Sequence, residues 1–170
     1  MSSESKPTNG RLFLIPCPIA ENATGTLSAE VPQIVSGLQH FLVENVRSSR
    51  RFISSLKLGL DISELQFHIL DKKTDTAQVA EYFQAIGAGT DIGVISEAGC
   101  PGVADPGAVA VALSHRQGRE VVPLIGPSSI LLALMGSGFS GQQFTFHGYL
   151  PIQTADLGQR LRQLEDKAYR

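Results

Sequence analysis

The sequence predicts an α/β protein: a doubly wound parallel sheet of five strands, followed by the start of a smaller mixed α/β domain. Two observations favour this class. Short apolar runs alternate with segments of helical periodicity along most of the chain. Several of these runs are apolar at nearly every position, which is typical of strands that are covered on both faces of a parallel sheet.

The first part of the chain predicts three strand–helix units. The expected strands, each a short apolar or alternating run, are Leu12–Pro16, a segment around Phe41–Glu44, and Leu65–Leu70. The expected helices follow from capping residues and apolar spacing. They are one that Ser28 caps and that tolerates Pro32 in its first turn, one over Arg47–Leu58 that Gly59 stops, and one over Thr76–Ile86 that Asp75 caps.

The second part continues the alternation. The expected elements are a strand over Asp91–Ser96, a helix over Ala108–Gln117 that Gly118 closes, a strand over Glu120–Leu124, a helix over Ser129–Met135 that Gly136-Ser137-Gly138 breaks, a strand over Phe144–His147, and a helix over Ala155–Arg170. The last strand and helix cannot bury their own apolar faces. We therefore expect a disordered N-terminus (1–10), an N-terminal domain (11–124), and a linker with an incomplete C-terminal domain (125–170).

Composition excludes several classes of protein. The chain has 170 residues, of which 42% are hydrophobic and 18% charged, and its net charge of −2 disfavours a strongly basic nucleic-acid module. Two cysteines and four widely separated histidines offer neither a disulfide framework nor the ligand spacing of a metal site. The hydrophilic start lacks the apolar segment of a signal peptide, and no apolar run approaches the ~20 residues that span a membrane. We expect a soluble cytoplasmic protein.

Three loops rich in glycine and proline follow predicted strands, at the edge where open α/β sheets bind ligands. They are Pro16–Pro18, Ser96–Gly107 and Ile125–Ser129. Proline fixes the backbone and glycine lets a ligand approach it, so the loops predict a rigid rim of carbonyl groups and small side chains. Because these loops contain no Lys or Arg, the rim suits a neutral or cationic ligand better than a pyrophosphate.

Other motifs with known chemistry are missing or misplaced. The stretch Gly87–Gly93 imitates a dinucleotide-binding fingerprint, but its spacing is wrong and it lies between a helix and a strand. The sequence has no P-loop, no nucleophile elbow and no HExxH zinc motif. A flavodoxin-like nucleotide binder stays open as a further class.

Five motifs in register carry a resemblance to a known family. They are LFLIPCPIAEN (Leu12–Asn22), VENVRSSRRFI (Val43–Ile53), SEAGCPGVADPG (Ser96–Gly107), VVPLIGPSSILLALMGSG (Val121–Gly138) and FTFHGYLP (Phe144–Pro151). Together they resemble the tetrapyrrole methylase family of S-adenosylmethionine (SAM)-dependent methyltransferases, most of all the branch that contains the small-subunit rRNA ribose 2′-O-methyltransferase. The chain departs from that branch at Cys100 and Ile125, and in reading Glu44-Asn45-Val46-Arg47 where Glu-Asp-Thr-Arg is usual.

The resemblance implies SAM as cofactor, rRNA as methyl acceptor and a homodimer. It implies acceptor-side or catalytic roles for Glu44 and Arg47. The cofactor-binding residues that it implies are Pro18, Glu97, Ala98, Gly99, Cys100, Pro101, Val103, Ala104, Asp105, Gly126, Pro127, Ser128 and Ser129. The alternatives are a tetrapyrrole C-methyltransferase and a truncated, non-catalytic relative.

Single residues in these motifs have alternative interpretations. Cys100 is better interpreted as a small loop residue than as a nucleophile, because nothing near it in the sequence activates a thiol. His147 is expected to pack against its neighbours or line the cleft rather than act as a base. The basic side chains of Arg47, Arg50 and Arg51 either contact RNA phosphates or form a solvated helix face.

Overall fold

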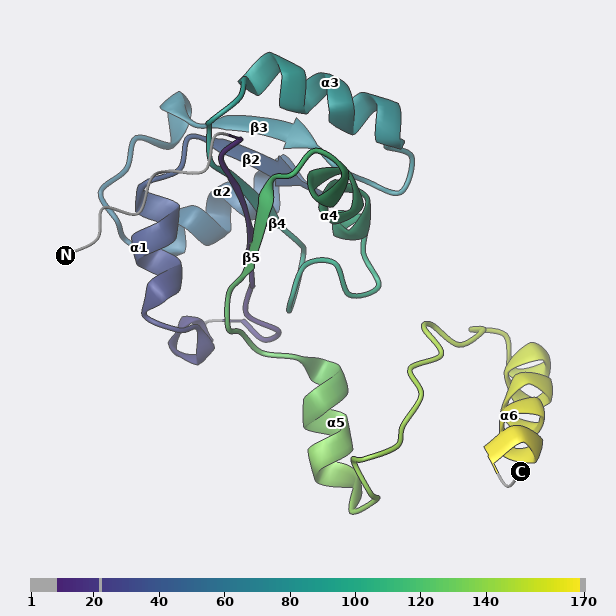
Figure 1. Ribbon diagram of the computed structural model, residues 1–170. Helices are drawn as coiled ribbons and strands as arrows, with labels where there is room; N and C mark the ends of the chain where they lie inside the picture. The colour runs from purple at the N-terminus through teal and green to yellow at the C-terminus, as the bar shows by residue number, and fades with distance from the viewer. Residues whose placement is uncertain (1–8, 22, 169–170) are drawn as a thin grey trace. The chain divides into compact units, whose positions relative to one another are not determined.

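Five parallel strands form a single sheet in the computed structural model, which describes residues 9–21 and 23–168 (Figure 1). The strands are β1 (Arg11–Ile15), β2 (His40–Val43), β3 (Gln66–Ile69), β4 (Ile92–Ile95) and β5 (Glu120–Pro123). Their order across the sheet is β3-β2-β4-β1-β5, and every neighbouring pair is parallel. The predicted α/β class with a parallel five-stranded sheet is confirmed.

Helices cover both faces of this sheet (Figure 1). They are α1 (Glu30–Ser36), α2 (Val46–Ser55), α3 (Thr76–Ile86) and α4 (Gly107–Arg116), with short 3₁₀ turns η1 (Thr24–Thr26) and η2 (Ile62–Glu64). Side chains of α1 and α2 pack on Phe13, Ile15 and Phe41 in one core cluster. Side chains of α3 and α4 pack on Leu12 and Leu42 in a second cluster on the other face. The sheet is therefore doubly wound, as predicted.

The winding places a switch point between the central strands β1 and β4. These strands are neighbours in register, with Leu12 opposite Ile92 and Ile15 opposite Ile95. The chain leaves β1 toward α1 on one face and leaves β4 toward α4 on the other face. Such a reversal opens a crevice beyond the carboxyl ends of the two strands, where open α/β sheets bind their ligands.

Two helix ends differ from the sequence prediction. Ser28 does not cap α1: the helix starts at Glu30 after Ala29, and the Ser28 hydroxyl is buried without a hydrogen-bond partner among the described residues. Helix α2 ends at Ser55 and not at Leu58, because Lys57 adopts a left-handed conformation with φ of 54°. The predicted cap of Asp75 on α3 is confirmed, since its side chain accepts a hydrogen bond from the Gln78 N–H.

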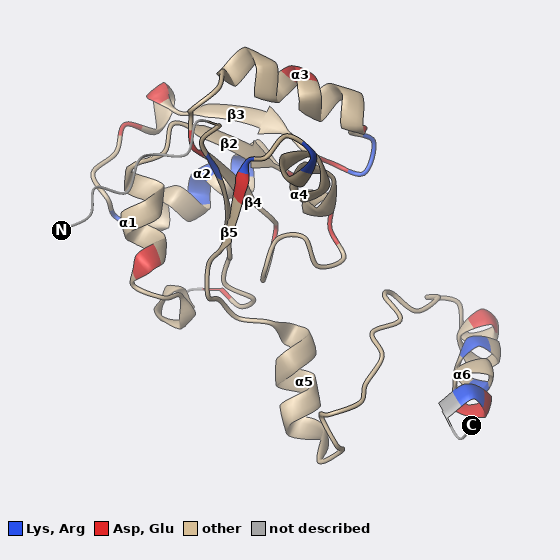
Figure 2. Cartoon of the chain, in the orientation of Figure 1, with Lys and Arg blue, Asp and Glu red and all other residues tan. Residues whose placement is uncertain are grey.

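The chain divides into two compact units, Met1–Ser129 and Ile130–Arg170. Nearly all of α5 (Ser129–Ser137) and all of α6 (Thr154–Ala168) lie in the second unit. Helix α5 carries no charged residue and buries no side chain, while α6 mixes both signs of charge (Figure 2). The predicted division into residues 11–124 and 125–170 stays a prediction.

Two predictions on the second unit are wrong. Phe144–His147 is not a strand, because no described segment of this unit offers a neighbouring strand to pair with. Helix α5 continues through Gly136 to Ser137, two residues past the predicted end at Met135. In α5, local hydrogen bonding therefore outweighs the low helix propensity of one glycine.

Most of the N-terminal segment predicted to be disordered, residues 1–8, lies outside the described residues. Asn9 and Gly10 are described. The Asn9 side chain donates a hydrogen bond to the Gln117 carbonyl over 2.9 Å, and Gly10 is buried. Among the described helices, none combines the length and the apolar composition required to cross a membrane.

Candidate functional site

The loops that follow β1 and β4 are joined at the switch point. The Cys17 N–H donates to the Gly99 carbonyl over 2.9 Å, and the Gly99 N–H donates to the Cys17 carbonyl over 3.0 Å. The Ser96 hydroxyl adds weaker hydrogen bonds to the carbonyls of Ala98 and Gly99. Two of the three predicted loops therefore form one hydrogen-bonded unit at the edge of the sheet.

The loop after β5 packs against the other two. The Cys100 thiol lies 3.4 Å from the Pro127 carbonyl oxygen and 3.7 Å from that of Gly126. Gly126 lies so close to Pro16 that an added Cβ atom would come within 2.1 Å of the proline Cβ. Only glycine fits there without displacing the backbone, so the three loops are held in one arrangement before any ligand arrives.

Asp105 organises the far part of the Ser96–Gly107 loop. Its Oδ1 atom accepts hydrogen bonds from the N–H groups of Gly102, over 2.8 Å, and Gly107, over 2.7 Å. Gly99, Gly102 and Ala104 adopt left-handed backbone conformations, of which that of Ala104, at φ 61°, is unusual for a residue with a Cβ atom. The Asp105 carboxylate thus holds the loop with one oxygen, and its Oδ2 atom has no partner among the described residues.

A fourth loop, after β2, reaches the same edge. The Glu44 Oε2 atom accepts a hydrogen bond from the Glu97 N–H over 3.1 Å, and the Ser48 hydroxyl donates to Glu97 Oε1. Asn45 caps α2, because its Oδ1 atom accepts from the N–H groups of Arg47 over 2.9 Å and Ser48 over 3.3 Å. The sequence motif around Glu44 therefore fixes the start of α2 beside the β4 loop.

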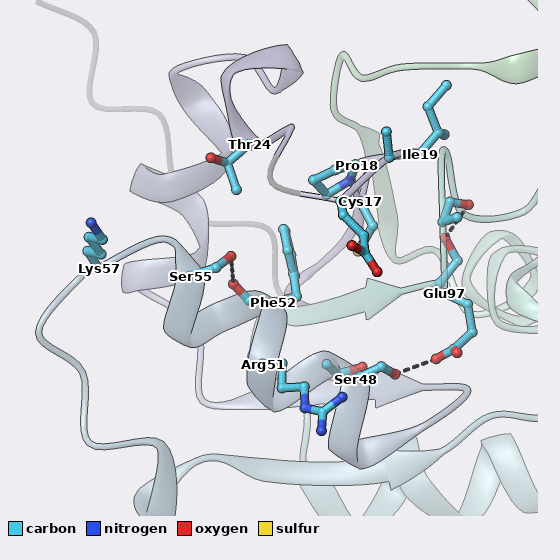
Figure 3. Close-up of a pocket in the computed structure, with 15 residues that line it drawn as sticks. Cys17, Pro18, Ile19, Thr24, Ser48, Arg51, Phe52, Ser55, Lys57 and Glu97 are labelled. Carbon is cyan, nitrogen blue, oxygen red and sulfur yellow. Dashed lines mark hydrogen bonds between the residues drawn. The ribbon is translucent and has the colours of Figure 1, made fainter.

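A cavity of about 770 Å³ lies between α2 and the loops after β1 and β4 (Figure 3). The side chains that line it come from three segments of the first unit: Cys17, Pro18, Ile19, Ala20, Glu21 and Thr24; Ser48, Ser49, Arg51, Phe52, Ser55 and Lys57; Ser96, Glu97 and Ala98. Of the residues predicted to bind the cofactor, Pro18, Glu97 and Ala98 line this cavity.

The other predicted residues lie along the joined loops or beside them. The contacts between loops described above involve Gly99, Cys100, Gly126 and Pro127. The remaining residues differ in solvent exposure: Pro101 is buried, Ser128 is half-buried, and Val103, Ala104 and Ser129 are exposed. Arg47 is exposed, and its side chain has no hydrogen bond or ion pair with a described residue. The structure thus brings Glu44 to Glu97 but leaves Arg47 at the surface.

The α2 side of the cavity was missed by sequence reasoning. Ser48, Arg51, Phe52 and Ser55 stand at positions i, i+3, i+4 and i+7, so they share one face of the helix. Of these four, Arg51 was singled out from the sequence, as a residue that either contacts RNA phosphates or lies on a solvated helix face. The repeated polar side chains on its face are the signal that could have identified this wall.

Burial changes the acidity of both cysteines. The pKa of the Cys17 thiol is raised to about 12, first by burial and then by the negative charge of Glu97. Burial also raises the pKa of the Cys100 thiol. Neither thiol is therefore a thiolate at neutral pH, which agrees with the interpretation of Cys100 as a packing residue. Within the described part of the chain, no three potential ligand side chains gather to hold a metal ion.

Comparison with curated proteins identifies relatives named ribosomal RNA small subunit methyltransferase I. The chain is 31% identical over 161 residues to that of Mesorhizobium japonicum, and the match covers 95% of this chain and 51% of the relative. It is 28% identical over 167 residues to that of Bacillus subtilis, covering 98% of this chain and 55% of the relative. It is 28% identical over 157 residues to that of Xylella fastidiosa, and the match covers 92% of this chain and 55% of the relative.

These matches confirm the resemblance to the rRNA methyltransferase branch. The chain spans about half the length of the curated relatives that it matches. No family model matches the chain.

Proposed function

We propose, from the kinship of this chain with the ribosomal RNA small subunit methyltransferase I proteins, that it binds SAM at the carboxyl edge of its sheet and acts in methyl transfer to a ribose hydroxyl of rRNA. One observation carries the proposal. In a chain similar to those proteins, the loops after β1, β4 and β5 are locked together at the switch point by Cys17, Gly99 and Gly126.

The residues on this rim fit the charge of the ligand. SAM carries a sulfonium cation, an amino-acid end and an adenosine, and it has no phosphate. The three loops contain the carboxylates of Glu97 and Asp105 and no Lys or Arg. Val103 and Ile125 present exposed apolar side chains, with 48% and 78% of their surface accessible, that an adenosine or a methylene chain could cover.

The residues proposed to hold SAM are those of the three loops: Pro18, Glu97, Ala98, Gly99, Cys100, Pro101, Val103, Ala104, Asp105, Gly126, Pro127, Ser128 and Ser129. Among them, the main chain around Gly99-Cys100-Pro101 and Gly126-Pro127-Ser128 would bind the methionyl and adenosyl parts. When bound, SAM supplies an electrophilic methyl group.

Glu44 and Arg47 are proposed to serve the acceptor side. Methyl transfer depends mainly on alignment of the nucleophile with the methyl carbon, and an oxygen nucleophile also requires a base. Glu44 accepts a hydrogen bond from the Glu97 N–H next to the rim, so the two carboxylates would both lie on the proposed acceptor side. Arg47, exposed at the start of α2, would attract the phosphates of the RNA.

Assembly and cellular location belong to the same proposal. The family resemblance implies a second copy of the chain as partner and the cytoplasm as the place of action. Because this chain matches only about half of each relative, methyl transfer, rRNA and the dimer are all proposed for it on the basis of that partial match.

The direct test is transfer of labelled methyl groups from SAM to unmethylated small ribosomal subunits. We expect label in the rRNA with the wild-type chain and a strong loss with Glu44→Gln. Glu81→Gln, on the exposed side of α3, serves as the matched control and should behave as wild type. If SAM binds but no label reaches the rRNA, the proposed activity is refuted in favour of a non-catalytic relative.

A further inference from the structure

The cavity beside α2 shares Pro18, Glu97 and Ala98 with the loops proposed to hold SAM, and its other wall is formed by α2 and Lys57. Its volume of about 770 Å³ is in the usual range of small-molecule sites. The α2 wall contributes an aromatic ring, hydroxyl groups and two cations, from Phe52, Ser48, Ser55, Arg51 and Lys57. None of these side chains is needed to join the three loops, so this wall is available for a second ligand.

The basic side chains of α2 differ in their surroundings. The Arg50 guanidinium lies over the ring of Phe67, 5.3 Å from its centroid. Arg47 is exposed outside the cavity, whereas Arg51 lines it. Neither Arg51 nor Lys57, the next cation along this wall, forms an ion pair with a described residue. The cavity therefore holds two positive charges that form no ion pair within the described residues, together with the carboxylates of Glu21 and Glu97.

The opposite end of the cavity is acidic. Figure 3 shows Glu97 and Lys57 at opposite ends of the α2 segment, with Arg51 and Phe52 between them. The Ser48 hydroxyl donates to Glu97 Oε1, and Glu97 Oε2 has no partner among the described residues. Glu97 also follows Ser96 at the end of β4, so this acidic end adjoins the loops proposed for SAM.

We propose that this cavity seats one nucleotide of the RNA acceptor, with its ribose toward Glu97 and its phosphates toward Arg51 and Lys57. This inference rests on the proposed function, and it identifies the acceptor subsite that methyl transfer to RNA would require. A carboxylate accepts hydrogen bonds from ribose hydroxyls, and cations bind phosphates. Phe52, which packs in the core and exposes 9% of its surface, forms an apolar part of the wall between the two ends.

In this seat Glu97 takes the proton of the reacting hydroxyl. With SAM bound, its methyl group would pass to the ribose oxygen, the bonding electron pair would stay on sulfur as a neutral thioether, and the hydroxyl proton would pass to the Glu97 carboxylate. Ser48 orients that carboxylate through its hydrogen bond to Oε1, which leaves Oε2 for the proton.

Binding of a fluorescein-labelled single-stranded RNA, followed by anisotropy at several salt concentrations, tests the phosphate end. Each phosphate contact on a single strand contributes about 0.7 to the slope of log affinity against log salt, so Arg51→Gln with Lys57→Gln should lower the slope by about 1.4. Arg116→Gln, an exposed cation in the last turn of α4, is the matched control and should leave the slope unchanged. The proposed nucleotide site is contradicted if the double variant has the same salt slope as Arg116→Gln, or if the wild-type chain does not bind the RNA.

Glu97→Gln tests the acidic end. The amide still accepts a hydrogen bond but is a poor base, so methyl transfer should fall by about 10²-fold or more while RNA affinity is retained. Equal methyl transfer by wild type and Glu97→Gln would refute the proton-accepting role.

In the same preparations, a thermal shift with S-adenosylhomocysteine separates the two proposals. If the wild type binds S-adenosylhomocysteine but the salt slope of RNA binding is the same in the double variant, only the nucleotide site is rejected. If the wild type does not bind S-adenosylhomocysteine, the proposed function is rejected.

Discussion

Cys17 and Gly99 exchange a pair of backbone hydrogen bonds, 2.9 and 3.0 Å long, across the point where the sheet changes its direction of winding. This pair joins the loop after β1 to the loop after β4. With Gly126 packed on Pro16, it makes the carboxyl edge of the sheet a preformed surface. A ligand that binds there does not have to order these loops, so little of its binding free energy is lost to conformational entropy.

Gly126→Ala should separate the β5 loop from this surface. The new Cβ would lie 2.1 Å from Pro16 Cβ and 2.4 Å from its Cγ, so the backbone must move. Overpacking of this kind costs about 1–3 kcal/mol in free energy of unfolding, and we expect weaker binding of S-adenosylhomocysteine as well. Urea unfolding and calorimetry measure the two effects.

Gly25→Ala is the control for that substitution, because no heavy atom lies within 4 Å of its added Cβ. It should change neither stability nor binding appreciably. If Gly126→Ala unfolds at the same urea concentration as wild type and Gly25→Ala, the close packing of the β5 loop on Pro16 is not present in solution.

Asn45→Ala should loosen the start of α2. The side chain accepts hydrogen bonds from the N–H groups of Arg47 and Ser48, and loss of such a cap costs about 1 kcal/mol. Asn45→Asp restores the residue usual in the related branch and can cap equally well, so its midpoint of urea unfolding should match wild type. Equal midpoints for Asn45→Ala and Asn45→Asp would contradict the capping role.

The two cysteines should differ in reactivity. Cys17 is buried with a pKa raised to about 12, whereas Cys100 is only partly buried. With iodoacetamide at about pH 8, we expect slow alkylation of Cys100 and none of Cys17, because the thiolate is the reactive form. Peptide mass spectrometry identifies the modified residue, and denaturant should make both react. Faster alkylation of Cys17 in the folded protein would show that its loop is open.

Stability should fall in mild acid because of a histidine pair. His40 Nδ1 lies 3.5 Å from His68 Nε2. Burial lowers the pKa of both imidazoles below 6.5, and the charge of His40 lowers that of His68 further. The unfolded chain therefore takes up protons at a higher pH than the folded chain, so the free energy of unfolding decreases as pH falls through about 6.5 toward the folded-state values.

Urea unfolding at about pH 7.5 and about pH 5.5 measures this dependence. His68→Gln should reduce it, since the variant loses one of the two imidazoles whose pKa is lowered in the folded chain. His115→Gln, an exposed residue of α4, is the control and should keep the wild-type dependence. An unchanged pH dependence in His68→Gln would mean that the pair does not titrate as described.

Local patterns were enough to predict the sheet and most helices. The continuous apolar runs, the Asp75 cap and the Gly/Pro loops all act over a few residues. The contacts between Glu44 and Glu97, and between Cys100 and Pro127, join positions far apart in the chain and could not be derived from spacing. Phe144–His147 shows the opposite case: a sequence suited to a strand stays irregular where it has no neighbouring strand.

Calorimetric titration of the 170-residue chain with S-adenosylhomocysteine tests the central claim most directly. The claim is that loops without basic residues, joined through Cys17, Gly99 and Gly126, form a binding surface for the methyl donor. We predict saturable heat at one site per chain, and weaker binding by Gly126→Ala. Absence of heat from a folded wild-type chain at high concentration would contradict the account.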